Sequence, residues 1–296
     1  MQADPPLTKP TIEEPAVQRT IIEGDGRQKL VDWPELWRYR DLFYFLVWRD
    51  IKTRYAQSIL GVGWAVIQPL FSMVVFTIVF GNFARVSSDG VPYAIFSYTA
   101  LVPWTYFSTT LTTSSGSLIS ASNMLSKVYF PRLIIPLAPA LSKLVDFAIA
   151  LLILVAMVLY FNAVPDSAAV IDPNAGILAL PLLILLMMLT ATGMGMWLTA
   201  LAIQYRDINY AMSFFVQLLM YAAPVVYPAT SVPEQFRLLY GLFPMAGVIE
   251  GFRSALLGTN PMPWDLIAIG AVTAIILFIT GTLYFRRMER IFADVV

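Results

Sequence analysis

Three basic residues, Arg49, Lys52 and Arg54, lie close together just before the first strongly apolar stretch of the chain. Guanidinium and ammonium groups in that position can bind phosphate groups at the level of the lipid headgroups. They can equally anchor a helix to an anionic membrane surface, a role that needs no ligand. The residues alone leave both roles open, and either role places this segment at a membrane surface.

The same segment has the spacing of an amphipathic helix that continues directly into the apolar stretch. Asp32, Trp33 and Pro34 have the residue types of a helix start, so we expect interfacial helices over residues 32–60. The charged residues are predicted to share one face. The opposite face is predicted to carry Phe43, Val47, Ile51, Tyr55 and Ile59.

The chain lacks the residues of the common catalytic and metal sites. It has no cysteine and no histidine, which excludes thiol nucleophiles, Ser-His-Asp catalysis and Cys/His metal sites. It has no GxxxxGK[ST] phosphate loop and no Asp-x-Asp pair, so it does not hydrolyse ATP by the usual P-loop route. We expect a protein that is not an enzyme, holds no metal or cofactor, and draws energy from another subunit.

The composition is that of an integral membrane protein. Hydrophobic residues make up 58% of the chain and charged residues 13%, with a mean hydropathy of +0.70; soluble domains contain about 45–50% apolar and about 25% charged residues. We predict an all-α polytopic fold with six transmembrane helices within residues 61–290. The predicted spans are 62–81, 93–115, 144–161, 177–203, 208–226 and 266–285.

The basic residues predict the orientation. All of them except Arg85, Arg237 and Arg253 precede the first span, follow the last one, or lie in the loops after the second and fourth spans. The positive-inside rule therefore places both termini in the cytoplasm. Residues 1–31, rich in proline and charge, are expected to form a flexible cytoplasmic tail, and residues 286–296 a cytoplasmic C-terminus.

The second predicted span is dense in hydroxyl groups, with Thr105, Thr109 and Thr112 on one helical face. Such a face can pack closely on another helix or bind a polyhydroxylated substrate. Aromatic side chains, which stack on sugar rings but also form interfacial belts, occur in the second and fifth spans. The aromatic candidates for lining a substrate path are Trp104, Tyr106, Phe107, Phe214, Phe215 and Tyr221.

Two loops on the predicted inner side are candidates for contacts with a soluble partner. After the second span, a short helix is expected near Asn123 to Tyr129, and prolines 131, 136 and 139 are expected to interrupt any longer helix. Lys127 and Arg132 flank aromatic residues there, as in a docking helix or a plain topogenic loop. Arg206 and Asp207 offer a smaller contact. Asp146 is expected to pair with Lys143.

On the predicted outer side, prolines divide residues 228–263 into two short amphipathic pieces, each too short to span a membrane. We expect a re-entrant helix pair there. Glu250 and Arg253 are three residues apart on the second piece and can neutralise each other where water is scarce. We assign them to an outer gate.

Three motifs in order resemble the permease domain of ABC-2 type exporters, most closely the polysaccharide branch that exports O-antigen, capsule and teichoic acid. The resemblance extends over residues 42–290. The first motif is Arg49-Asp50-Ile51-Lys52-Thr53-Arg54-Tyr55 with Ser58, Leu60-Gly61, Trp64 and Gln68-Pro69; the second is Lys127-Val128-Tyr129-Phe130-Pro131-Arg132; the third is Pro244 with Ile249, Glu250, Phe252-Arg253 and Leu256-Leu257-Gly258.

The resemblance implies a homodimeric permease in the bacterial inner membrane, joined to two copies of an ATPase subunit that binds ATP and Mg. The implied substrate is a glycan linked to a polyprenyl diphosphate lipid. The candidates for binding its diphosphate are Arg49, Lys52 and Arg54. The expected ATPase-coupling residues are Arg49, Lys52, Arg54, Asn123, Lys127, Tyr129, Arg132, Arg206 and Asp207. The alternatives are an ABC-2 exporter of teichoic acid, capsule, small lipids or drugs, and, from other classes, a membrane glycosyltransferase or glycan polymerase and a proton-coupled carrier.

Overall fold

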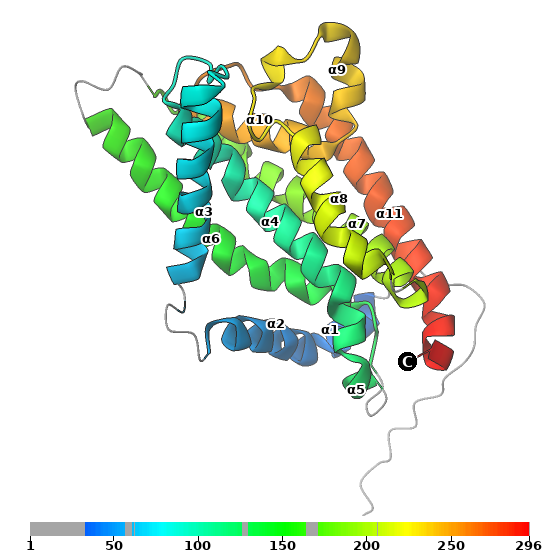
Figure 1. The fold of residues 1–296 in the computed structure, drawn as a ribbon. Helices are drawn as coiled ribbons and strands as arrows, with labels where there is room; N and C mark the ends of the chain where they lie inside the picture. The colour runs from blue at the N-terminus through cyan, green and yellow to red at the C-terminus, as the bar shows by residue number, and fades with distance from the viewer. Residues whose placement is uncertain are drawn as a thin grey trace, which may run out of the picture.

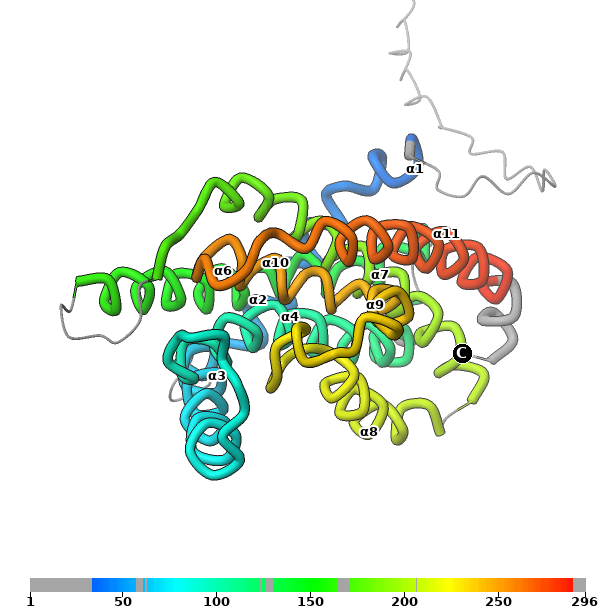
Figure 2. The backbone as a smooth tube through the Cα atoms, turned by 90° about the horizontal axis from the view of Figure 1, so that it is seen from above, coloured from blue at the N-terminus to red at the C-terminus, as the bar shows by residue number. Residues whose placement is uncertain are grey.

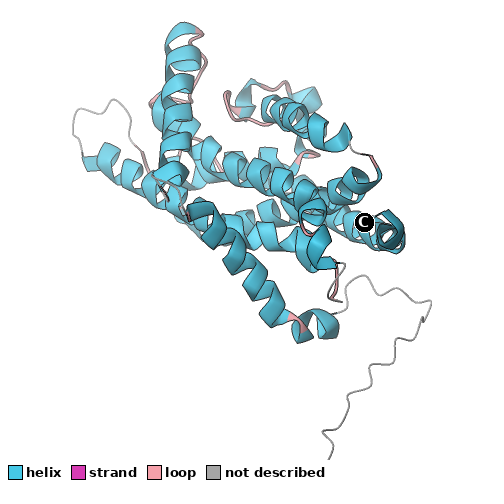
Figure 3. Cartoon of the chain, turned by 60° about the horizontal axis from the view of Figure 1, so that its bottom comes forward, coloured by secondary structure: helices cyan, strands magenta, loops and turns pink. Residues whose placement is uncertain are grey.

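The computed structural model describes residues 33–56, 61, 63–125, 130–163, 171–205 and 207–295, and every regular element among them is a helix (Figure 3). The predicted all-α class is therefore confirmed. In chain order the helices are α1 (Trp33–Arg38), α2 (Arg40–Tyr55), α3 (Gly63–Phe76) with its π-helical continuation η1 (Thr77–Phe83), α4 (Tyr93–Ser120), α5 (Ser122–Leu125), α6 (Ile134–Ala163), η2 (Ala175–Ala179), α7 (Leu180–Gln204), α8 (Asp207–Ala222), η3 (Ala229–Ser231), α9 (Glu234–Gly241), α10 (Pro244–Leu257) and α11 (Trp264–Val295).

Among the described residues, four helical stretches are long and apolar enough to cross a membrane. They are Gly63–Phe83, Ile134–Ala163, Ala175–Gln204 and Trp264–Glu289. The 28 residues of α4 would extend over about 42 Å, but its many hydroxyl side chains lower its hydropathy. The 16 residues of α8 are fewer than the roughly 20 that a span needs. The chain is a multi-pass membrane protein, and the six-span topology stays a prediction.

The helices α4 and α7 form the centre of the bundle (Figure 1). α7 packs along α11 and α4, and α4 also packs on α6. Glycine allows the close approach of α7 and α11, because a methyl group at Gly193 would lie 2.7 Å from the backbone nitrogen of Phe278. Small residues at such crossings are typical of helix packing in membranes.

At one end of the bundle α2 lies crosswise to the long helices, together with α1, α5 and the C-terminal end of α11 (Figure 1). We name this the α2 end. The opposite end carries α9 and α10, and all 14 residues of α10 are buried there among α4, α7 and α11. We name it the α10 end. Two short helices therefore do precede α11, whereas their insertion into a membrane as a re-entrant pair stays a prediction.

The helices α3 and α8 lie at the rim of the bundle on the same side of α4 (Figure 2). Each has a single buried residue, Pro69 in α3 and Met212 in α8. Large apolar side chains on both are exposed, among them Phe71 at 68% and Phe214 at 64%. None of the described residues of a single chain covers these side chains.

The expectation that prolines interrupt the chain after the second span is wrong for two of the three. Pro136 and Pro139 both lie within α6, which begins at Ile134. Pro136 falls in the first turn, where a backbone N–H has no partner within the helix and its loss costs little. The carbonyl of Pro136 accepts a hydrogen bond from Ser114 Oγ at 3.0 Å, which ties this first turn to α4.

Candidate functional site

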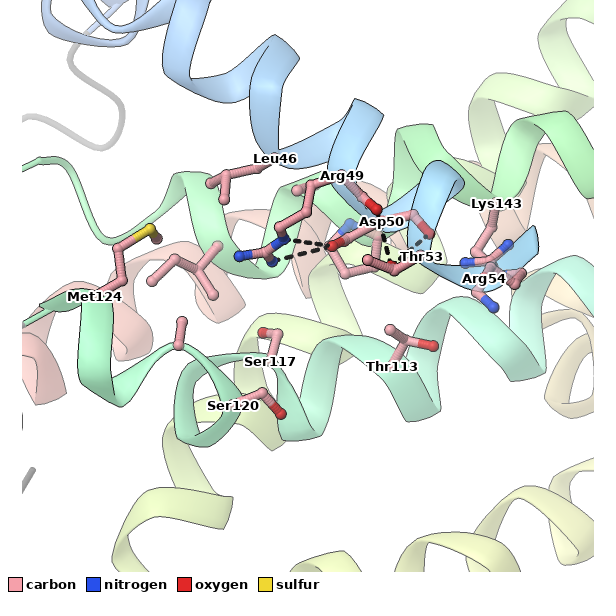
Figure 4. Close-up of a pocket in the computed structure, with 14 residues that line it drawn as sticks. Leu46, Arg49, Asp50, Thr53, Arg54, Thr113, Ser117, Ser120, Met124 and Lys143 are labelled. Carbon is pink, nitrogen blue, oxygen red and sulfur yellow. Dashed lines mark hydrogen bonds and ion pairs between the residues drawn. The ribbon is translucent and has the colours of Figure 1, made fainter. Parts of the chain in front are cut away.

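Two cavities lie between α2, α4 and α6 on the α2 side of the bundle. The lower cavity, of about 340 Å³, is lined by residues that include Arg49, Asp50, Thr113, Ser117 and Ser120 (Figure 4). The upper cavity, of about 280 Å³, lies beside α3 and is lined by residues that include Trp64, Gln68, Thr105, Thr109 and Asp146. Arg54 and Lys143 line both cavities, so these two side chains form the wall that the cavities share.

One face of α4 supplies hydroxyl groups to both cavities. The hydroxyl residues on this face are spaced by about one turn of helix, as the sequence predicted for Thr105 and Thr109. They are Thr105, Thr109, Thr113, Ser117 and Ser120. Thr109, Thr113 and Ser120 each donate to the carbonyl four residues earlier, at 2.7, 2.7 and 3.0 Å. A hydroxyl that donates its only proton to its own helix keeps two lone pairs. This face of α4 therefore presents hydrogen-bond acceptors.

Thr112 was placed on the same face by the sequence, but it lines neither cavity. It is exposed and donates to Ser108 at 2.8 Å. The residue at the expected place is Thr113, which faces α2 across the lower cavity (Figure 4).

An ion pair joins the last turn of α2 to α6. Arg54 Nη1 donates to Asp146 Oδ2, and Tyr55 Oη donates to Asp146 Oδ1. The expected pair of Asp146 with Lys143 is wrong, because the two neighbouring side chains of α2 occupy both carboxylate oxygens. Burial, together with the hydrogen bond to Asp146, raises the pKa of Tyr55 to about 12. The phenol therefore remains a donor to this carboxylate at neutral pH.

The sequence predicted that the charged residues of α2 share one face. This prediction is wrong. Asp50 and Arg54 are half-buried on the same side as the buried Leu46. Lys52 is exposed and lines neither cavity, whereas Arg49 lines the lower cavity and binds Asp50 with Nη2 at 3.0 Å from Oδ1. The exposed side of α2 carries aromatic residues, including Trp48 at 52% exposure.

The aromatic candidates for a substrate path divide into two groups. Trp104, Tyr106 and Phe107 are buried in the core, where Tyr106 Oη donates to the Ala140 carbonyl at 2.8 Å. The rings of Trp104 and Phe107 lie 5.5 Å apart between centroids. On α8, Phe214 and Tyr221 are exposed, whereas Phe215 is half-buried against the core. Of the buried three, Tyr106 lines the upper cavity, and Trp104 and Phe107 line neither of the two cavities.

The expected coupling residues lie partly outside the described residues. The coupling residues that lie outside the described residues are Lys127, Tyr129 and Arg206, and the side chain of Asn123 in α5 is also not described. Arg132 Nη1 donates to the carbonyl of Glu289 in α11 at 2.8 Å, and Asp207 is exposed at the start of α8. Arg132 thus ties the segment before α6 to the end of α11.

At the α10 end, Glu250 and Arg253 form a buried ion pair with Arg253 Nη1 2.8 Å from Glu250 Oε1. Arg253 also donates to the carbonyls of Val225 and Tyr227, at 3.0 and 3.2 Å. Glu250 Oε1 accepts from the backbone nitrogen of Ala229 at 2.9 Å. The pair therefore holds the turn that follows α8 against α10.

Sequence reasoning missed two polar residues of these sites. Lys143 was considered only as a partner for Asp146, and its position on both cavities depends on tertiary structure. Asp89, in the loop before α4, accepts from Asn260 Nδ2 at 2.8 Å and from Thr230 Oγ1 at 3.3 Å. No group of three or more His, Cys, Asp or Glu side chains that could hold a metal occurs among the described residues.

Comparison with known proteins identifies the family. The family model described as "ABC-2 type transporter" matches residues 41–257. The chain is 26% identical to an "O-antigen export system permease protein RfbA" of Klebsiella pneumoniae, over 86% of this chain and 95% of the relative. A protein of the same description from Myxococcus xanthus is also 26% identical, with the same coverage.

A more distant relative, "Polysialic acid transport protein KpsM" of Escherichia coli, is 21% identical over 81% of this chain and 91% of the relative. The family model covers most of the chain, including the second helix, both cavities and the buried ion pair of α10. The chain therefore belongs to the ABC-2 type transporter family and is a membrane permease rather than an enzyme.

Proposed function

We propose that this permease exports a polysaccharide, carried on a polyprenyl diphosphate lipid, from the cytoplasm across the bacterial inner membrane. The single observation that carries the proposal is the acceptor-rich face of α4 along both cavities. Sugar hydroxyls are donors as well as acceptors, so a row of acceptors with one-turn spacing suits a chain of sugar rings. The names of the relatives, which refer to O-antigen and polysialic acid, support the same class of substrate.

The α2 end is the cytoplasmic end in this proposal. It carries Arg49, Lys52 and Arg54 as well as Arg286 and Arg287 at the end of α11, which is the distribution that the positive-inside rule requires. Residues 1–31 and 286–296 then lie in the cytoplasm, and the segment 228–263 lies at the outer surface as a re-entrant pair. The Glu250–Arg253 pair fixes the outer end of α8 and serves as part of an outer gate.

A separate ATPase subunit supplies the energy. Two permease copies assemble with two ATPase copies, which bind ATP and Mg. The exposed side of α3 and α8 faces the second copy and the path between them, where Phe214 and Tyr221 are placed to stack on sugars. The ATPase contacts the α2 end through α5, Arg132, Asp207 and the basic residues of α2. When the ATPase changes conformation, Arg132 transmits the movement to α11 through its hydrogen bond to the carbonyl of Glu289.

Reconstitution tests the function directly. The full chain is co-expressed with a P-loop ATPase subunit, co-purified and placed in liposomes loaded with a lipid-linked glycan. We expect ATP hydrolysis to rise with the glycan, and the glycan to become accessible on the opposite face only with ATP. The matched control carries an ATPase subunit unable to hydrolyse ATP. Purified permease that transports alone under a pH gradient would overturn the proposal in favour of a proton-coupled carrier.

The same preparation separates the remaining alternatives. A lipid or drug exporter would show ATPase stimulation by glycan-free amphiphiles and none by the lipid-linked glycan. A glycosyltransferase or polymerase would lengthen the glycan in the absence of ATPase. Competition between a negatively charged and a neutral lipid-linked glycan shows which of the two kinds of glycan the permease prefers.

A further inference from the structure

A half-buried lysine that makes no hydrogen bond or ion pair with the described residues lies in the wall between the two cavities. Lys143 lies on α6 and, like Arg54, lines both cavities. Within the described part of the chain, no hydrogen bond or ion pair involves its ammonium group. A charged group that has lost water and gained no partner costs free energy, and an anion bound beside it offsets that cost.

Arg54, the second cation of this wall, is already paired with a carboxylate of the same chain. Arg54 binds Asp146, and the same carboxylate accepts from Tyr55. In the lower cavity Arg49 is paired with Asp50. The wall and its surroundings thus contain three cations and two carboxylates, which leaves one positive charge in excess. The guanidinium of Arg54 and the ammonium of Lys143 come from different helices and approach the same space (Figure 4).

We propose that Arg54 and Lys143 form a diphosphate-binding site in which Asp146 occupies Arg54 until the ligand arrives. The diphosphate then replaces the Asp146 carboxylate on Arg54 and gains Lys143 as a second partner. This inference rests on the proposed function, and it assigns the diphosphate to Arg54 and to Lys143, a residue that sequence reasoning had considered only as a partner for Asp146. The inference removes Lys52 from the candidates for diphosphate binding, because Lys52 is exposed and lines neither cavity.

The charge count favours a diphosphate over a carboxylate. A ligand with one negative charge would neutralise the excess at Lys143 and leave the Arg54–Asp146 pair intact. A diphosphate carries at least two negative charges and several acceptor oxygens, so it exceeds that excess and competes for the guanidinium, which binds phosphate well. Displacement of Asp146 follows from this imbalance.

The upper cavity indicates that the diphosphate arrives on a lipid. Its wall includes Trp64 and Gln68 of α3, and the outer side of α3 exposes Trp64 at 55% and Phe71 at 68%. A diphosphate held at Arg54 and Lys143 therefore lies beside a helix that exposes large apolar side chains. A polyprenyl chain can run along that surface while its diphosphate stays in the wall.

Binding measurements on the full chain in lipid nanodiscs test the site without a glycan or an ATPase. The probes are undecaprenyl diphosphate, undecaprenol and inorganic diphosphate. We expect Lys143→Met to weaken binding of the lipid diphosphate about tenfold, the effect of losing one hydrogen bond to a charged group, and Lys143→Arg to restore it. Asp146→Asn removes the internal competitor and is expected to tighten binding at least about threefold. Lys52→Met is the matched control and should change binding by less than about twofold.

Each outcome decides the matter. Equal losses for Lys143→Met and Lys52→Met would mean that general surface charge holds the lipid, and would overturn the site. Binding of Asp146→Asn that is unchanged or weaker would overturn the displacement. Inorganic diphosphate that binds as tightly as the lipid form would overturn the lipid source. Thermal unfolding of each variant verifies its fold, and Asp146→Asn decides the proposal if Lys143→Met does not fold. If the variants change lipid diphosphate binding as expected but the protein does not export glycan, the proposed function is wrong and the diphosphate site is still supported.

Discussion

The guanidinium carbon of Arg253 lies 3.6 Å from the centre of the Phe96 ring. This contact joins α10 to α4 at the α10 end, and it places a completely buried cation on an aromatic face. Glu250 neutralises the same guanidinium, and two backbone carbonyls accept hydrogen bonds from it. The turn after α8 therefore depends on two side chains of α10, Glu250 and Arg253, for its position.

Replacing Arg253 should destabilise the protein strongly. Arg253→Met leaves Glu250 buried without its cation and two carbonyls without their donor, and removal of one partner from a buried pair typically costs about 3–5 kcal/mol. Arg237→Gln is the control, because its pair with Asp265 at 2.6 Å is half-exposed and such pairs contribute at most about 1 kcal/mol. Denaturant unfolding in detergent measures both. Equal stability of the two variants would show that the buried pair contributes no more than a surface pair.

The approach of α7 to α11 predicts a contrast between two glycines. A Cβ at Gly193 would meet backbone atoms of Leu277 and Phe278 at 2.7–2.9 Å, whereas nothing lies within 4 Å of one at Gly116 in α4. We expect Gly193→Ala to lower the free energy of unfolding by about 1–3 kcal/mol through overpacking. Gly116→Ala should be neutral or stabilising by up to about 1 kcal/mol. Thermal unfolding of the two variants compares them, and a stable Gly193→Ala protein would contradict this helix crossing.

Local spacing was sufficient to predict some features of the site. The row of hydroxyls on α4 follows from i, i+4 spacing, and Thr105 and Thr109 lie where that spacing put them. Thr112 was wrong by one residue because the face that opens to the cavities is set by α6, which packs on α4, and by α2, which packs on α6 and lies across the cavities from α4. Helical periodicity defines the faces of a helix but not which face a neighbour covers.

Tertiary contacts explain the features that the sequence did not reveal. Asp146 has Lys143 three residues away, yet it binds Arg54, which is 92 residues away in the chain. A local pair is visible in a sequence, whereas the competing partner appears only once α2 lies across α6. Trp104 and Phe107 are buried for a similar reason, because α4 is central in the bundle and most of its faces contact other helices.

The hydrogen bond between Tyr55 and Asp146 predicts a dependence of stability on alkaline pH. The Tyr55 pKa is raised from 10.0 to about 12 by burial and by this bond, so the folded state holds the proton more tightly than the unfolded state. The contribution of the phenol is therefore fully present below about pH 10 and is lost as the pH rises toward 12. Wild type should exceed Tyr55→Phe in stability by about 1 kcal/mol near pH 8. This difference should shrink above pH 10, and a constant difference up to pH 12 would contradict the bond.

The acceptor face of α4 predicts different effects of two neighbouring substitutions on glycan export. Thr113→Val and Thr112→Val remove the same atom, conserve side-chain volume and break equivalent bonds to the carbonyl four residues earlier, at 2.7 and 2.8 Å. Only Thr113 lines the lower cavity, so only its loss takes an acceptor from the glycan. We expect Thr113→Val to slow export about threefold to tenfold, the range for one lost hydrogen bond, and Thr112→Val to export at the wild-type rate. Export is measured as ATP-dependent appearance of glycan outside proteoliposomes, at matched amounts of folded protein. Equal rates for the two variants would mean that the hydroxyls serve helix packing, and a slower Thr112→Val would place the path on the other side of α4.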